Sequence, residues 1–290
     1  MIDRYLIRYF LGIVDHGSFS AAALHCRVTQ PTLSAGIAKL ESLLGQRLFD
    51  RSGRRVRLTE AGTQLAHHAR RIEAEFAAAE RSALGMQPHR LVRIGVAPSL
   101  PTPWLGVALA AAREAAADER IEIVEGRSNE LHAKLDRGRI DTLLGVLDPA
   151  DPEPALFEEG YGVAMALAHP LAGEASVTAD RIAGDTMIVR RHCEALADVS
   201  RFFTARGVRP FMAARTVSDD RAAAYVAAGL GITVMPYSLR SAGMAMPALS
   251  GFALRRRIGL RTPDAARGRL ADSAGLAAFA ATLRRLGEGL

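Results

Sequence analysis

Side chains that hydrogen-bond to nucleic acids are concentrated between residues 29 and 57. Five arginines fall within the eleven residues 47–57, and a Thr-Gln-Pro triplet with nearby hydroxyl groups lies before them. Guanidinium groups suit phosphate, while amide and hydroxyl groups can hydrogen-bond to base edges in the major groove. These residue types predict binding to double-stranded DNA, and the candidate contacts are Thr29, Gln30, Pro31, Thr32, Ser34, Lys39, Arg51, Arg54, Arg55 and Arg57.

Three short helices are expected to position these side chains. Apolar residues recur at helical spacing near the N-terminus, Gly17 ends that helix, and Ser18 can cap a second one. Thr29 can cap the third, with Pro31 in its first turn, where a missing N–H has no cost. The third helix has small and polar residues on the face that would enter a major groove. Its inner stripe is predicted to be Leu33, Ile37, Leu40 and Leu44.

A basic β-wing is predicted after the third helix. Leu48-Phe49 and residues 56–58 are typical of two short strands around a Ser52-Gly53 turn, and arginines lie at the tip and on the arms. A solvated arginine run is the alternative interpretation. The position directly after a helix pair favours a clamp on the DNA backbone instead.

The charge distribution supports this interpretation. Residues 1–90 hold 13 Lys and Arg against 8 Asp and Glu, whereas residues 91–290 hold 24 against 23. A basic module attached to a nearly neutral one is typical of nucleic-acid binding.

With 290 residues, of which 49% are hydrophobic, the chain should form more than one globular unit. We expect no signal peptide, no membrane association and a cytoplasmic location, and two distant cysteines agree with a reducing compartment.

A long helix is predicted beyond Thr59, and its apolar residues alternate spacings of four and three. This heptad seam indicates contact between two subunits, in a dimer or a tetramer. His67 and His68 point about 100° apart on a helix and make a poor metal site, so no metal or cofactor is expected. The predicted dimerisation residues are Leu65, Ala69, Ile72 and Phe76.

The run from Gly17 to Gly62 closely resembles the winged helix–turn–helix of LysR-type transcriptional regulators. The matching motifs, in order, are Phe19, Ala22-Ala23, Thr29-Gln30-Pro31, Leu40-Glu41, Leu44-Gly45, Leu48-Phe49-Asp50-Arg51 and Leu58-Thr59-Glu60-Ala61-Gly62. Two departures are Cys26, where leucine is usual, and Ala35-Gly36, where many members carry Arg or Gln. The second departure suggests fewer direct base contacts from the recognition helix.

Beyond a linker at 85–88, the pattern alternates between strands and helices, which predicts α/β units with parallel sheet. This part is similar to the effector-binding domain of the same family, a two-lobed α/β domain like the periplasmic binding proteins. The matching pieces are Gly138-Arg139-Ile140-Asp141, His169-Pro170-Leu171-Ala172 and Ala228-Gly229-Leu230-Gly231. The predicted domains are 1–58 (winged helix–turn–helix), 59–88 (linker and dimerisation helix) and 89–290 (effector binding), with lobe I at about 89–161 and 262–290 and lobe II at about 162–261.

A cleft between two such lobes is a common place for a small ligand. The resemblance implies that an effector contacts Ser99, Ser128, Asn129 and the loop from Arg190 to Cys193, including Arg191 and His192. Helix N-termini at Ser99, Ser128 and Asn129 would favour a carboxylate effector. The alternative is that these residues only cap helices.

An enzyme and a thiol redox sensor are the alternative functions. The sequence contains none of the common catalytic motifs G-x-S-x-G, H-E-x-x-H, G-x-x-x-x-G-K-[ST] or G-x-G-x-x-G, so an enzyme of α/β fold is disfavoured. A thiol redox sensor of the same family, using Cys193 beside His192, is an alternative that lacks a resolving cysteine in its own domain. RNA polymerase would be a further partner if the regulator activates transcription.

Overall fold

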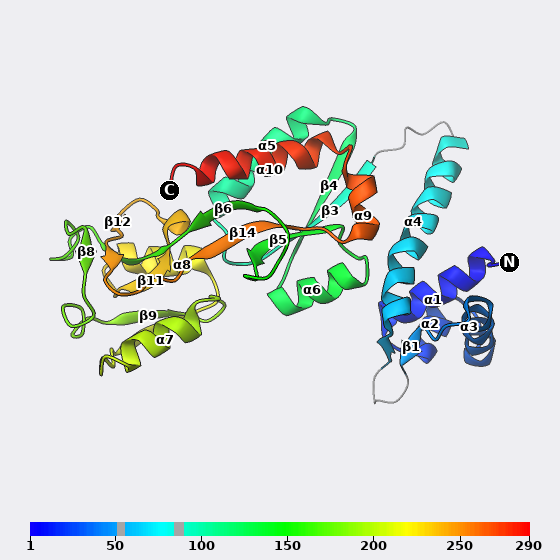
Figure 1. The fold of residues 1–290 in the computed structure, drawn as a ribbon, viewed down its shortest axis with the longest axis horizontal. Coiled ribbons are helices and arrows are strands. Elements are labelled where there is room, and N and C mark those ends of the chain that lie inside the picture. Colours follow the sequence, from blue (N-terminus) through cyan, green and yellow to red (C-terminus); the bar gives the residue numbers. More distant parts are fainter. Residues whose placement is uncertain (51–55, 84–89) are drawn as a thin grey trace.

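The computed structural model describes residues 1–50, 56–83 and 90–290, apart from the side chains of residues 78 and 81–83. Within these residues, one extended helix lies between the rest of the N-terminal module and a long α/β body (Figure 1). None of the described helices is long and apolar enough to cross a membrane.

The N-terminal module contains three helices, a small wing and the start of the long helix. The helices are α1 (Arg4–His16), α2 (Phe19–His25) and α3 (Gln30–Leu44), followed by the antiparallel strands β1 (Phe49–Asp50) and β2 (Arg57–Leu58) and by α4 (Glu60–Ala83). Apolar residues of all four helices and of the wing meet in one core, with Phe10, Leu33 and Ile37 at its centre.

The predicted end of the first helix at Gly17 and the predicted caps at Ser18 and Thr29 are confirmed. Gly17 and Gly45 follow α1 and α3 with φ of 70° and 65°, a left-handed conformation in which glycine is favoured. The Ser18 hydroxyl accepts a hydrogen bond from Ala21 N, and the Thr29 hydroxyl accepts one from Thr32 N. These caps satisfy backbone donors that a helix cannot satisfy internally.

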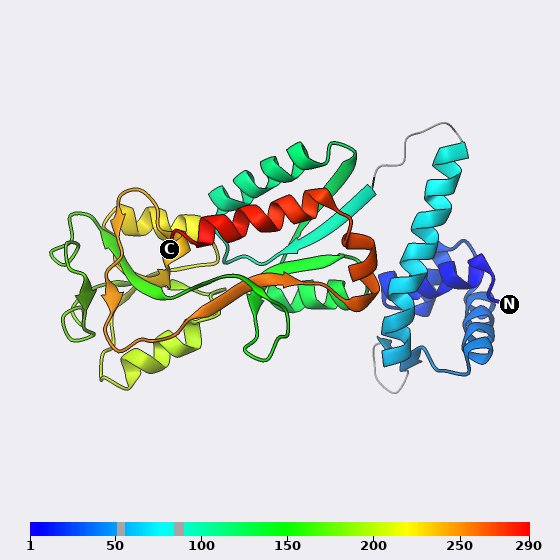
Figure 2. The same ribbon diagram turned by 45° about the horizontal axis from the view of Figure 1, so that its top comes forward.

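Lobe I is built on a five-stranded sheet of order β4-β3-β5-β14-β6. Strands β3 (Arg90–Val96), β4 (Glu119–Glu125) and β5 (Thr142–Leu147) are parallel, and β14 (Arg256–Arg261) runs antiparallel between β5 and β6 (Ala155–Glu159). Helices α5 (Thr102–Ala115) and α10 (Ala274–Gly287) pack together on one face of the sheet, α6 (Ser128–Asp136) lies on the other, and α9 (Asp264–Leu270) faces α4 (Figures 1 and 2).

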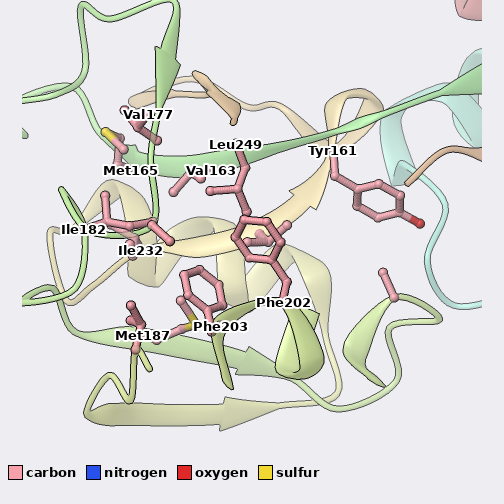
Figure 3. Packing of buried hydrophobic residues seen from close by; sticks show 14 of the residues in the cluster. Tyr161, Val163, Met165, Val177, Ile182, Met187, Phe202, Phe203, Ile232 and Leu249 are labelled. Carbon is pink, nitrogen blue, oxygen red and sulfur yellow. The ribbon is translucent and has the colours of Figure 1, made fainter. Parts of the chain in front are cut away.

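Lobe II contains shorter strands around its own apolar core. Strand β7 (Tyr161–Ala166) pairs with β11 (Thr233–Pro236), β12 (Met244–Ala245) and β13 (Ala248–Leu249), and β13 also pairs with β8 (Ser176–Val177). Strands β9 (Met187–Arg190) and β10 (Met212–Thr216) form a parallel pair flanked by α7 (Leu196–Thr204) and α8 (Asp219–Ala227), and η1 (Tyr237–Leu239) follows β11. Figure 3 shows the rings of Phe202 and Phe203 packed in this core.

The predicted boundary between lobe I and lobe II near residue 161 is consistent with the sheets. The chain was also predicted to return to lobe I near residue 262, and this position is wrong. Tyr161 begins β7 in lobe II, whereas the chain has already returned to lobe I at Arg256, where β14 enters the first sheet. Strand β14 was not predicted from the sequence, because its "RRIGLR" is short and carries three arginines.

Candidate nucleic-acid interface and effector cleft

The exposed face of α3 is the one predicted from helical spacing. Gln30, Pro31, Thr32, Ala35, Ala38 and Lys39 are exposed, and Ser34 is half-buried. Leu33, Ile37 and Leu40 are fully buried on the opposite face. Leu44 is an exception, since it is 36% exposed, and the inner stripe therefore ends at Leu40.

Three polar side chains on this face are already engaged within the module. The Thr29 and Thr32 hydroxyl oxygens lie 2.8 Å apart and share one hydrogen bond. Lys39 Nζ donates to the Tyr5 hydroxyl at 3.1 Å and lies 3.6 Å from an Asp3 carboxylate oxygen. Gln30 and Ser34 are the other polar candidates on α3 for reading bases.

Gly36 faces the core and not the DNA-binding side. A Cβ built at this position would lie 2.7 Å from Cδ2 of Tyr9, so only glycine fits beneath that ring. Of the two residues that depart from the family pattern, only Ala35 therefore removes a polar side chain from the exposed face.

The family motifs around the wing have a direct structural role. Glu41 Oε1 accepts hydrogen bonds from the backbone N–H groups of Leu48 and Phe49, at 2.8 and 3.4 Å. Thr59 donates to the Arg47 carbonyl at 2.6 Å and accepts from Gly62 N at 3.0 Å. These bonds fix the wing between α3 and α4 and leave Arg57 exposed on β2. Arg51, Arg54 and Arg55 lie outside the described residues.

The predicted dimerisation residues divide into two groups. Ala69 is fully buried and Leu65 is partly buried against the core of the N-terminal module. The prediction that Ala69 contacts a second subunit is therefore wrong, because its own chain already covers it. Ile72 and Phe76 are 39% and 43% exposed and line an open hollow of about 560 Å³ together with His68, Arg71, Glu75 and Ala79.

A cavity of about 240 Å³ lies between the two lobes, and three predicted effector residues line it. These are Ser99, Ser128 and His192. Ser128 and the exposed Asn129 begin α6, as expected, but Ser99 lies before the start of α5 at Thr102. Asn129 and Arg191 are exposed and do not line the cavity, which corrects the prediction for these two residues.

Several cavity residues were missed by sequence reasoning: His132, Asp148, Asp151, Glu194 and Arg261. Asp148 directly follows β5, so the carboxyl-end rule for parallel strands could have found it. Arg261 belongs to β14, which the sequence did not predict, and Asp151 pairs with it at 2.8 Å.

A buried arginine joins the two lobes behind this cavity. Arg256 donates to Glu159 Oε1 in lobe I at 2.8 and 3.0 Å, and to Glu194 Oε1 in lobe II at 2.8 Å. The Tyr161 hydroxyl donates to the same Glu194 oxygen at 2.8 Å. Burial opposes ionisation of Glu194, but Arg256 holds its pKa below the usual value, so the carboxylate is charged at neutral pH.

Cys193 lies beside a buried charged cluster next to the cleft. Arg190 Nη1 is 3.2 Å from Cys193 Sγ, and Arg190 Nε donates to Asp219 Oδ1 at 2.5 Å. Burial raises the pKa of the Cys193 thiol, and the nearby guanidinium offsets this only in part. His192 Nε2 is 3.2 Å from Asp219 Oδ2, yet both histidine nitrogens lack a hydrogen-bond partner among the described residues.

No group of three or more His, Cys, Asp or Glu side chains in the described part of the chain is arranged to hold a metal ion.

The winged helix–turn–helix and the two-lobed body together define a DNA-binding transcriptional regulator with a ligand-binding domain. The chain belongs to the LysR family. Residues 5–63 match the bacterial regulatory helix-turn-helix proteins of the lysR family, and residues 85–286 match the LysR substrate binding domain. Members of this family regulate transcription and are not enzymes.

Its relatives include a probable hydrogen peroxide-inducible genes activator of Mycobacterium avium, 32% identical over 80% of this chain and 77% of that protein. The DNA-binding transcriptional dual regulator OxyR of Escherichia coli K12 is 29% identical over 79% of this chain and 77% of that protein. A full-length OxyR variant from Pseudomonas aeruginosa has the same fold, with a TM-score of 0.63, 22% identity, and coverage of 96% of this chain and 95% of that one. CbnR in complex with its target DNA gives a TM-score of 0.50 at 19% identity, covering 98% and 99% of the two chains.

Proposed function

We propose that this regulator responds to a small polar effector that binds in the cavity between its two lobes. The observation that carries the proposal is that both lobes contribute side chains to one cavity, with Ser99 and Ser128 from lobe I and His192 from lobe II. A ligand that contacts both lobes can favour one arrangement of them and so bias the attached DNA-binding module.

The charges in the cavity refine the class of effector. Ser128 lies at the N-terminus of α6, where a carboxylate is favoured. However, Asp148, Asp151 and Glu194 also line the cavity, and of these Asp151 is paired with Arg261 and Glu194 with Arg256. A purely anionic ligand would be repelled by Asp148. We therefore favour an amphoteric effector that carries both a carboxylate and an amine.

Thermal shift measurements on the full-length protein with matched pairs of compounds test this class. Aspartate and succinate, which differ by one amino group, form one such pair. The aminated member should raise the melting temperature more, because only it can pair with Asp148. Asp148→Asn should remove this preference and Ser128→Ala should weaken both ligands, whereas Asn129→Ala, outside the cavity, should leave the shifts unchanged. A larger shift with the plain carboxylate would contradict the amphoteric assignment.

Thiol sensing through Cys193 is a second candidate, and the peroxide-inducible relatives favour it. The raised pKa of the buried thiol opposes it, since the thiolate is the reactive form. The only other cysteine of the chain, Cys26, lies in the DNA-binding module. In a Cys26→Ser background, we expect iodoacetamide to alkylate native Cys193 far more slowly than the denatured chain at pH 8. A native rate equal to or above the denatured rate would instead support a sensor thiol.

We also propose that Ile72 and Phe76 on α4 contact a second copy of this chain. Both are large apolar side chains on an open face of a long helix, and Arg4 covers only part of Phe76 with its guanidinium carbon 4.2 Å from the ring centroid. A pair of such helices would place two DNA-binding modules on one operator.

A further inference from the structure

Lobe II contains a second cavity, separate from the cleft between the lobes. It has a volume of about 360 Å³ and lies between α7 and the strands β9, β10 and β11. Its walls are mainly apolar, and they include Met187, Val189, Leu196, Val199, Phe203 and Met212. A concave, mostly apolar space of this size with a few polar groups is typical of a small-molecule site.

The charged side chains that line this cavity are all positive. Its lining includes Arg190, Arg209 and Arg215 but no aspartate or glutamate among the described residues. Arg190 is 2% exposed, is paired with Asp219, and keeps Nη2 without a hydrogen-bond partner. Arg209 and Arg215 are exposed, and neither forms an ion pair within the described part of the chain.

The two cavities therefore differ in charge. The charged lining of the cleft between the lobes is three carboxylates and one arginine, whereas that of the lobe II cavity is three arginines and no carboxylate. One ligand would not suit both cavities, because an anion that pairs with Arg215 would meet Asp148 in the cleft.

We propose that the lobe II cavity is a second ligand site, which binds a compact amphipathic anion. A short acyl chain or a single aromatic ring would pack against Val199 and Phe203, and its carboxylate or sulfonate would pair with Arg215 and Arg209 at the rim. The two cavities share no lining residue, although Cys193 of the lobe II cavity lies between His192 and Glu194 of the cleft in the sequence.

Calorimetric titration of the full-length protein with octanoate, 1-octanol and octylamine tests the proposal. These probes share one chain length and differ in charge, so octanoate should bind most tightly and octylamine should not bind. Arg215→Glu should weaken octanoate binding by about tenfold or more, because it places a like charge beside the ligand. Arg201→Glu is the matched control on α7, outside the cavity and 73% exposed, and should change the affinity by less than about twofold.

Val199→Trp, which fills the cavity, should abolish binding of octanoate. Ser128→Ala in the cleft should leave octanoate binding unchanged, which separates this site from the proposed effector site. The proposal is wrong if wild-type protein does not bind octanoate, if the three probes bind equally, if Arg201→Glu weakens binding as much as Arg215→Glu, or if Ser128→Ala abolishes it.

Discussion

Gly62 holds the start of α4 against the wing because it has no side chain. A Cβ at this position would lie 2.2 Å from the Leu48 carbonyl oxygen, and that backbone atom cannot move away as a flexible side chain could. The same carbonyl accepts a hydrogen bond from Thr59 N at 3.0 Å. This bond holds the Leu48 carbonyl close to Gly62. This contact gives a physical reason for the final glycine of the "LTEAG" motif.

Gly62→Ala should destabilise the DNA-binding module by about 1–3 kcal/mol, since the added methyl group has no space and the backbone must shift. Gly106→Ala is the control, because nothing lies within 4 Å of a Cβ there and the position is inside α5. It should stabilise the protein by about 0.5–1 kcal/mol through helix propensity. Urea denaturation followed by circular dichroism would measure both, and equal effects of the two substitutions would exclude steric overlap at Gly62.

At the level of elements, α3 and the wing are expected to have different roles in DNA binding. Helix α3 presents Gln30 and the half-buried Ser34 on a face of small residues, while β2 presents Arg57. Side chains that contact base edges carry sequence information, whereas those that contact phosphate supply affinity without it. Substitutions in the two elements should therefore give different signatures.

Arg57→Ala should weaken binding to operator and random DNA alike and reduce the magnitude of the salt slope by about 0.9, because one phosphate contact is lost. Gln30→Ala should leave that slope nearly unchanged and lose discrimination of about 1–3 kcal/mol at one base pair. Fluorescence anisotropy at several salt concentrations measures both quantities. If Arg57→Ala affects only the specific operator, Arg57 reads sequence and this division of roles is wrong.

Helix α4 is the element proposed to contact a second copy of the chain. Ile72→Asp should place a charge in the proposed contact between two copies and shift the protein towards monomers, because an unpaired buried charge costs several kcal/mol. Gln64→Asp, an exposed position of the same helix outside the hollow, should leave the dimer intact. Light scattering over a concentration series measures the oligomeric state. Stable dimers in Ile72→Asp would move the main interface away from α4.

At the scale of the whole molecule, Asp15 is at the centre of a group of polar contacts between the DNA-binding module and lobe I. Asp15 on α1 pairs with Arg70 of α4 and with Arg139 of lobe I, whose Nε is 3.0 Å from Asp15 Oδ1. Arg139 also donates to the Asp15 carbonyl at 2.5 Å, and Arg70 donates to the Arg137 carbonyl at 2.9 Å. Burial opposes ionisation of Asp15, yet the two guanidinium groups hold its pKa below the usual value.

Arg139→Gln should destabilise the native protein by about 1 kcal/mol at neutral pH, since the pair is partly exposed. A carboxylate with a lowered native pKa contributes its stability above the unfolded pKa of about 3.9 and loses it as the pH falls through the native value. The difference from wild type should therefore be full at pH 5–7 and shrink below pH 4. Arg137→Gln, two residues away, should show no such pH dependence in thermal unfolding, because Arg70 contacts Arg137 through the backbone carbonyl.

The sequence by itself determined the local structure of the DNA-binding module. Its caps, its turns and the buried face of α3 depend on contacts between residues a few positions apart, and these follow from helical spacing and residue type. The ordered motifs from Phe19 to Gly62 also determined the family. For the same reason Ser128 and Asn129 were correctly placed at the start of a helix.

Only the tertiary structure decided how distant segments combine. Strand β14 enters lobe I from a segment about 110 residues after β5, and it brings Arg261 to the cleft and Arg256 to Glu159 behind it. No local pattern in the sequence encodes that pairing. Burial of Ala69 by its own chain and the acidic lining of the cleft likewise depend on which surfaces meet, because a side chain's partners across the fold are set by topology and packing and not by its neighbours in sequence.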